Sequence, residues 1–266
     1  SPKGLSVHED GALYVLDTAH GLQEYSTLDG SFVGTLADET KSEGGVQVVG
    51  DTIFVSAASN SGGTVHKFDI TGTLLETFPS SLSDVDLTAG GYDVAVAGDG
   101  TVYVSNYLSD GVEVYNGKTG EHLMQVLGDT RALGIAFGPD DMLYAAINGE
   151  DEVQRFTTAS DGNLTLVDAF INGGSGSRTR SGPWGVTVNQ DDYLIYVCWA
   201  GSQEVTEYSQ SGAELRWWFP GQSVSAIVAG EDDDSSGPGN ALSPLYVAVD
   251  GGGDVFVSAQ VEDEGD

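Results

Sequence analysis

The chain has 266 residues, and 39% of them are hydrophobic, which is enough apolar material for a folded core and excludes a chain disordered throughout. The 41 acidic residues outnumber the 9 basic ones, and the net charge of −32 disfavours binding to bare nucleic acid, because phosphates would be repelled. No apolar run approaches the roughly 20 residues of a membrane span, and a single Cys excludes an internal disulfide. Such acidity favours an extracellular or cell-surface location, in high salt or seawater.

The chain repeats one unit of four short strands. Each copy has an apolar strand, an acidic turn, a strand such as Leu-Tyr-Val, a polar loop, a strand ending in an aromatic residue, and a last strand after a Gly turn. By subtraction, the copies are 41, 46, 43, 51 and 41 residues apart when they are anchored on Gly4, Gly45, Gly91, Gly134, Gly185 and Ala226. This period predicts an all-β protein, a six-bladed β-propeller with mostly four-stranded antiparallel blades.

We expect a single domain over residues 1–266, which a longer precursor could contain, with blades at roughly 1–40, 41–86, 87–130, 131–180, 181–222 and 223–266. The sixth blade is expected to be incomplete, with strands at Ser225–Ala229, Leu245–Val249 and Asp254–Val257 and no fourth strand. Because an unpaired sheet edge is usually protected, the missing strand is expected elsewhere in a longer precursor or from a neighbouring molecule. A frayed three-stranded blade is the alternative.

The repeats resemble the NHL-type six-bladed propellers. The segments that carry the resemblance are SPKGLSV, GPWGVTV, GTVYVSN, GALYVLD and PLYVAVD, and the match extends over nearly the whole chain. The resemblance implies the propeller fold. It implies no particular activity, because propellers carry many unrelated functions.

Acidic residues are expected to gather on the face formed by the turns between first and second strands and between third and fourth strands. They are Glu9, Asp10, Asp29, Asp51, Asp99, Asp140, Asp141, Asp161, Asp191, Asp192 and Glu231–Asp234, opposed only by Lys118. The loops between blades hold five of the nine basic residues, which are Lys3, Lys41, Arg131, Arg178 and Arg180. We expect that second, mixed face to carry any ligand site.

The longest connector between blades, residues 172–185, places Arg178 and Arg180 in a Gly/Ser loop beside Trp184. Two guanidinium groups there would clamp a carboxylate or a sugar acid, unless the loop is merely flexible. Asn and aromatic residues on the same rim suit a carbohydrate, a peptide or a protein, and also ordinary turns. The candidate ligand-binding residues are therefore Asn106, Tyr107, Arg131, Arg178, Arg180, Trp184 and Trp199.

Three further segments suggest sites. The acidic run Glu231, Asp232, Asp233 and Asp234 offers oxygen ligands for Ca²⁺, although a solvated acidic loop is the alternative. Asn163-Leu-Thr is the only N-glycosylation sequon and would make a secreted form a glycoprotein. In the last strand of the fifth blade, Trp217 and Trp218 point to opposite sides, and they suggest a subunit interface or packing between blades five and six.

Catalytic signals are weak. The four His residues are scattered, no catalytic motif occurs, and Cys198 is expected to be buried and inert, so no catalytic residue is named. We expect a non-enzymatic extracellular module that binds another protein or copies of itself, through edge or head-to-tail contacts that build filaments. The alternative is a metal-dependent lyase or hydrolase with a divalent ion in or near the central channel.

Overall fold

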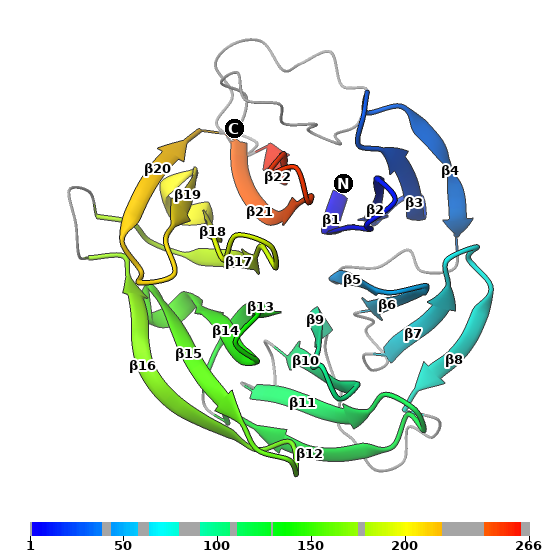
Figure 1. Cartoon of the computed structure of the whole chain (residues 1–266), viewed down its shortest axis with the longest axis horizontal. Coiled ribbons are helices and arrows are strands. Elements are labelled where there is room, and N and C mark those ends of the chain that lie inside the picture. Colours follow the sequence, from blue (N-terminus) through cyan, green and yellow to red (C-terminus); the bar gives the residue numbers. More distant parts are fainter. Residues whose placement is uncertain are drawn as a thin grey trace, which may run out of the picture.

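The computed structural model describes residues 2–38, 44–57, 64–79, 91–106, 111–128, 130–174, 179–219 and 242–261. These residues form five four-stranded antiparallel sheets and one two-stranded sheet, arranged as a ring (Figure 1). The protein is therefore an all-β propeller. No helix in this part of the chain is long and apolar enough to cross a membrane.

Each sheet is built from consecutive strands. The first sheet contains β1 (Pro2–Val7), β2 (Ala12–Asp17), β3 (Gly21–Ser26) and β4 (Phe32–Ala37). The second sheet contains β5 (Val46–Val49), β6 (Thr52–Ala57), β7 (Thr64–Asp69) and β8 (Leu74–Phe78). The third sheet contains β9 (Gly91–Val96), β10 (Thr101–Asn106), β11 (Gly111–Asn116) and β12 (His122–Val126). The fourth sheet contains β13 (Ala132–Phe137), β14 (Met142–Ile147), β15 (Glu152–Thr158) and β16 (Leu164–Asn172). The fifth sheet contains β17 (Pro183–Val188), β18 (Ile195–Trp199), β19 (Glu204–Tyr208) and β20 (Glu214–Trp218). The sixth sheet has two strands, β21 (Leu242–Val249) and β22 (Val255–Val261).

The first strand of every sheet lies at the axis of the ring. β1, β5, β9, β13, β17 and β21 contact one another in that order, and β21 returns to β1 (Figure 1). The second strand of a sheet is enclosed on both faces, so β2 is buried along its whole length, whereas the last strands β4 and β20 face solvent. This explains why the second strands read as continuous apolar runs.

The core lies between neighbouring sheets rather than at the axis. One cluster joins Tyr103 and Val114 of the third sheet to Leu143 and Phe156 of the fourth, and similar clusters fill the other junctions. Because the sheets pack face to face, only the edges of the first strands border the axis. A site at the axis therefore has to be built from those strands and their turns.

The expected strand order in the last sheet is wrong. Leu245–Val249 was expected as a second strand, but it belongs to β21, which lies at the axis between β17 and β1, and β22 pairs outside it. The reason is that SPLYVAV carries the same pattern as the first strands SPKGLSV and GPWGVTV. Ser225–Ala229 lies outside the described residues. The structure thus shows five four-stranded blades, not six, and a two-stranded sheet beside them.

Candidate functional site

Six equivalent positions surround the axis, one from each first strand. Each position lies one residue before a strand residue that pairs with the second strand of the same sheet. In the third sheet this residue is Val94, which pairs with Val104, and in the sixth it is Val247, which pairs with Val257. We call them the axial ring, and they are Gly4, Gly45, Asp93, Gly134, Gly185 and Tyr246. Four of the six are Gly, and the two side chains, Asp93 and Tyr246, come from the third and sixth sheets, which face each other across the ring (Figure 1).

Glycine is required in the axial ring because neighbouring first strands approach closely. A Cβ atom on Gly4 would lie 2.5 Å from the Val46 nitrogen, and one on Gly134 would lie 2.7 Å from the Gly185 Cα. No side chain fits there without moving the backbone. Asp93 and Tyr246 therefore stand out from the repeat as the two positions at which the axis receives a functional group.

The Asp93 carboxyl is buried, with 7% of the residue exposed, and it is held by the main chain of two strands. Oδ1 accepts a hydrogen bond from its own neighbour Val94 N, and Oδ2 accepts one from Ile135 N in the next sheet, each at 2.9 Å. The Asp93 N–H donates to Ser105 Oγ at 2.9 Å. Burial raises the pKa of Asp93 to about 7 and outweighs the two N–H bonds that lower it. Asp93 can thus gain and lose a proton near neutral pH.

Tyr246 spans the axis. Its hydroxyl donates to the Tyr92 carbonyl oxygen at 2.6 Å, although the two residues are 154 positions apart in the chain. The Tyr92 ring packs edge-on against the ring of Trp184, with centroids 6.1 Å apart. The phenol of Tyr246 therefore secures the peptide that leads directly into Asp93.

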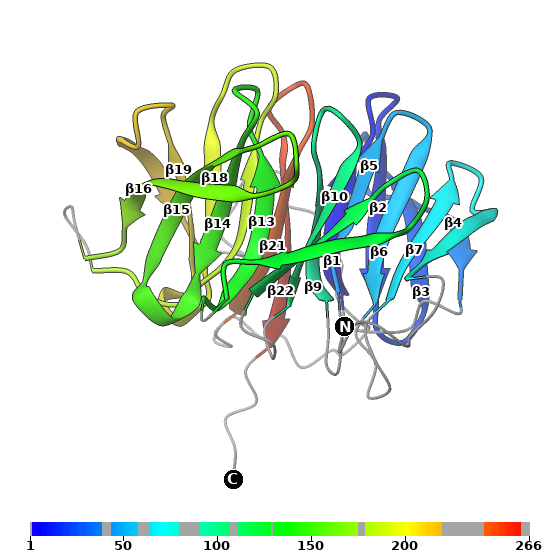
Figure 2. The same cartoon turned by 90° about the horizontal axis from the view of Figure 1, so that it is seen from below.

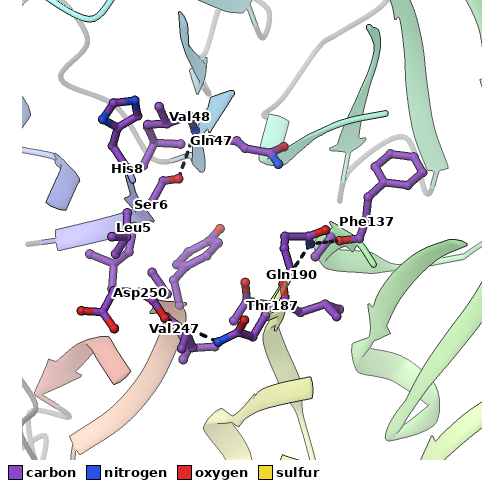
Figure 3. A pocket seen from close by; sticks show the side chains of 18 of the residues that line it. Leu5, Ser6, His8, Gln47, Val48, Phe137, Thr187, Gln190, Val247 and Asp250 are labelled. Carbon is purple, nitrogen blue, oxygen red and sulfur yellow. Dashed lines mark hydrogen bonds between the residues drawn. The ribbon is translucent and has the colours of Figure 1, made fainter. Parts of the chain in front are cut away.

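A cavity of about 630 Å³ extends along the axis from Asp93 and Tyr246 to the turns between first and second strands. All six first strands line its wall (Figure 3). Its rim includes the exposed residues Glu9 and Asp191, so the cavity opens to solvent on the face of these turns, which we call the hairpin face (Figure 2). The described cavity therefore opens on the acidic face, not on the face expected to bind ligands.

Hydrogen bonds between neighbouring sheets hold the cavity wall in place. Val48 N donates to Ser6 Oγ at 3.0 Å, and Gln190 Nε2 donates to the Phe137 carbonyl oxygen at 2.9 Å (Figure 3). Val96 N donates to Gln47 Oε1 at 2.7 Å. Asp93 differs from these wall residues because burial shifts its pKa toward neutral pH, which is the range that proton transfer requires.

The residues predicted to bind a ligand do not meet on one surface. Asn106 and Trp199 are fully buried at the ends of β10 and β18, and Arg131 is exposed before β13. Trp184 is half-buried against Tyr92, which makes it the predicted residue nearest the axial ring. Tyr107 and Arg178 lie outside the described residues.

Arg180 was predicted to face a ligand, and the structure places it in the interior with only 1% exposed. Its Nε donates to Glu204 Oε1, and its Nη1 donates to Glu214 Oε2 at 2.9 Å. The guanidinium therefore connects the start of the fifth sheet to β19 and β20. This arrangement is an ion pair within the fold.

The predicted calcium segment Glu231, Asp232, Asp233 and Asp234 lies outside the described residues. Within the described ranges, no three His, Cys, Asp or Glu residues gather closely enough to hold a metal ion. Both oxygens of Asp93, the one carboxyl in the axial ring, already accept a backbone N–H group. These residues therefore do not fit a divalent-ion site at the axis.

The remaining predicted residues lie on the outside of the ring or in its core. Asn163 is exposed in the turn before β16, and its glycosylation stays a prediction. The Trp217 ring packs on Phe219 and is 39% exposed, whereas Trp218 packs inward on Tyr196 between the last two sheets. Cys198 is fully buried as predicted, and burial raises the pKa of its thiol.

Asp93 and Tyr246 were not among the residues predicted from the sequence, although a signal for both is present in it. Every first strand contains an apolar-x-apolar triplet, and the residue before it reads Gly, Gly, Asp, Gly, Gly and Tyr along the chain. Anchoring the third copy on Gly91 and the sixth on Ala226 concealed this pattern. An alignment on the triplets would have identified both residues.

Comparisons with known proteins agree with the fold. No family model and no curated protein sequence matches the chain. Among solved structures, a gluconolactonase from Xanthomonas campestris is similar with a TM-score of 0.69 and 17% identity over 97% of this chain and 82% of that one. A virginiamycin B lyase from Staphylococcus aureus has a TM-score of 0.62 and 14% identity over 97% and 77% of the two chains. Such low identities show the propeller fold alone.

These comparisons contradict the expectation of a non-enzymatic module. The similar structures include a putative gluconolactonase with a TM-score of 0.69 and 13% identity, over 99% of this chain and 90% of that one. The two gluconolactonases and the lyase are enzymes by their names, which favours the enzymatic alternative.

Proposed function

We propose that the protein is a hydrolase or a lyase that acts on a small molecule in the axial cavity, with Asp93 as the acid–base group. The observation that carries the proposal is a buried carboxyl whose pKa is raised to about 7 at the inner end of an open cavity. The similar solved structures include a gluconolactonase and a virginiamycin B lyase. A lactone is therefore the first substrate class to test.

Both reaction types start with removal of a proton. In hydrolysis, the base takes a proton from the water that attacks the carbonyl carbon, and in elimination it takes one from a carbon beside a carbonyl group. A carboxylate with a pKa near 7 is basic enough to accept this proton and returns it readily to the leaving oxygen. Tyr246 acts as a positioning residue, because its hydrogen bond to Tyr92 holds the peptide that precedes Asp93.

The alternative function predicted from the sequence included a divalent ion in or near the central channel. In the part of the chain that the structure describes, no three His, Cys, Asp or Glu side chains gather to hold a metal ion, and the proton transfer proposed here is assigned to Asp93. Calcium binding at Glu231–Asp234 stays a proposal for a segment that lies outside the described residues.

Asp93→Asn tests the proposal, because it keeps the shape of the side chain and removes the base. Glucono-δ-lactone, δ-valerolactone and dihydrocoumarin serve as neutral substrates, and acid release is followed at constant pH. We expect the variant to lose about 100-fold or more in kcat. Asp141→Asn is the matched control, because Asp141 lies on the hairpin face outside the cavity lining, and it should remain within threefold of wild type. Full activity of Asp93→Asn would exclude the assigned role.

The two-stranded sheet is, in this proposal, the inner half of a sixth blade of one domain. β21 occupies the axial position of a first strand, and Tyr246 N donates to Ser258 Oγ as Asp93 N does to Ser105 Oγ. Ser258 Oγ also donates to the Lys3 carbonyl oxygen at 2.8 Å, which ties the sheet to β1. These shared contacts support six repeats around the axis.

A further inference from the structure

We infer that the axial cavity receives its substrate through the hairpin face and admits neutral or positively charged molecules in preference to anions. The inference rests on the proposed function, and it narrows the substrate class to lactones or esters that carry no anionic group. It opposes the earlier expectation of a carboxylate or a sugar acid held by arginines.

The shape places the opening on the hairpin face. The cavity lining begins at Asp93 and Tyr246 and ends at turn residues that include Glu9, Asp191 and Asp250. The described residues on the other side of the axial ring, such as Tyr92 and Trp184, do not line it. Tyr246 crosses the axis at this level and donates to the Tyr92 carbonyl oxygen. A molecule that reaches Asp93 through the described cavity therefore passes the rim of turns.

The acidic groups of the lining outnumber the basic ones. Among the described residues, the lining contains the carboxyl groups of Glu9, Asp191 and Asp250 near the rim and that of Asp93 at the inner end, and it contains no Lys or Arg. Its one imidazole, that of His8, lies 2.8 Å from a further carboxyl oxygen, Asp10 Oδ1. Glu9 and Asp191 are exposed, so their charges face the approaching molecule. A concave site lined by one sign of charge focuses the field and changes the local concentration of ions by about 10- to 1,000-fold. The net charge of −32 adds a general repulsion of anions.

Reactivity of an introduced cysteine measures this selection without knowledge of the substrate. Thr187→Cys places a thiol in the cavity wall (Figure 3). Methanethiosulfonate reagents that carry a trimethylammonium group, a sulfonate group or no charge then report access for a cation, an anion and a neutral molecule. The native Cys198 is fully buried and its thiol pKa is raised, so wild-type protein serves as the unreactive blank.

Thr165→Cys provides the matched control. Thr165 is an exposed residue of β16 on the outside of the ring and experiences the net charge but not the cavity. The ratio of the cationic to the anionic rate cancels differences in thiol reactivity between the two sites. At about 10 mM ionic strength, we expect this ratio to be at least tenfold higher at position 187 than at position 165. The excess should fall as salt is added, because salt screens exposed charges.

A double variant, Glu9→Gln with Asp191→Asn, separates the rim from the net charge. It should lower the ratio at position 187 by at least threefold and leave the ratio at position 165 unchanged. Ala136→Cys, in the adjacent first strand, repeats the measurement if Thr187→Cys does not fold.

Three results would overturn the inference. They are equal ratios at positions 187 and 165, no effect of the rim variant, or no reaction of the cavity thiol with the uncharged reagent. A positive result combined with inactivity toward lactones would leave the charge selection intact and would contradict the proposed function instead.

Discussion

The unusual feature at the scale of single residues is the placement of a carboxyl group where the repeat otherwise has Gly. The chain tolerates Asp93 because two backbone N–H groups, one from Val94 and one from Ile135, bind its oxygens. These bonds do not fully replace the water lost on burial, and the pKa of Asp93 therefore rises to about 7. A group with these properties destabilises the fold in its charged form, which is typical of a functional site.

The raised pKa predicts how stability depends on pH. Between about pH 4 and pH 7, the folded protein keeps a proton on Asp93 that the unfolded chain has lost, so the contribution of this group to the free energy of unfolding falls as pH rises. The rise of the Asp93 pKa from its ordinary value to about 7 corresponds to a loss of about 4 kcal/mol. Asp93→Asn lacks this loss, so the variant should gain stability relative to wild type by up to that amount as pH rises from 4 to 8.

Urea unfolding at several pH values measures this difference. Asp141→Asn is again the control, since Asp141 is an exposed residue, and its difference from wild type should not follow the same curve. A difference between Asp93→Asn and wild type that stays constant over this pH range would show that Asp93 titrates normally in the folded protein.

At the scale of elements, the sheets are joined by apolar clusters and by a few buried polar contacts. Within the fifth sheet, Arg180 makes a buried polar contact of this kind, since it lies just before β17 and pairs with Glu204 of β19 and Glu214 of β20. Charges taken out of water contribute little net stability as a pair, but the loss of one partner leaves the other buried and uncompensated. The pair therefore specifies how the chain enters the fifth blade.

Arg180→Met should lower the free energy of unfolding by about 3–5 kcal/mol, because it keeps the aliphatic stem and removes the charge. Arg155→Met is the matched control, since Arg155 pairs with Asp168, whose side chain is 44% exposed and can return to water. It should cost no more than about 1 kcal/mol. Chemical denaturation at pH 7 measures both values. Equal losses in the two variants would mean that burial does not decide the cost.

At the scale of the whole molecule, the ring closes through contacts between the two ends of the chain. β21 packs on β1, and Ser258 Oγ donates to the Lys3 carbonyl oxygen, 255 residues away. This closure is made by a protein with a net charge of −32, so the folded state concentrates like charges in a small volume. Self-repulsion of this kind weakens the compact state.

Added salt should therefore stabilise the protein. Raising NaCl from about 10 mM to about 500 mM shortens the Debye length from roughly 30 Å to below 8 Å, and the Tm should rise by several degrees. Thermal unfolding followed by circular dichroism measures the shift. CaCl₂ at matched ionic strength is the comparison, and a further rise would support the calcium site proposed at Glu231–Asp234. A Tm that does not change with NaCl would contradict the importance of self-repulsion.

The fold class could be predicted from the amino-acid sequence, because each repeat carries its own strand and turn signals. Alternation in Val94, Val96, Val102 and Val104 and the recurring Gly turns predicted consecutive antiparallel strands, and the structure confirms an all-β propeller. The burial of Cys198 was predicted for the same reason, since it lies within an apolar second strand. The burial of a strand residue depends on neighbours in the chain, whereas the propeller follows from the recurrence of the unit along the chain.

The position of the site and the face on which the cavity opens could not be predicted from local sequence, because both depend on contacts between distant strands. Asp93 and Tyr246 belong to opposite sheets, and they meet because the ring brings together strands that are distant in sequence. Arg180 looked like a ligand-binding residue within a Gly/Ser loop, yet the third and fourth strands of its blade enclose it in acids. The alternation of residues along a strand shows on which side of the sheet a side chain lies. The groups that surround this side chain come from strands that only the folded ring brings together.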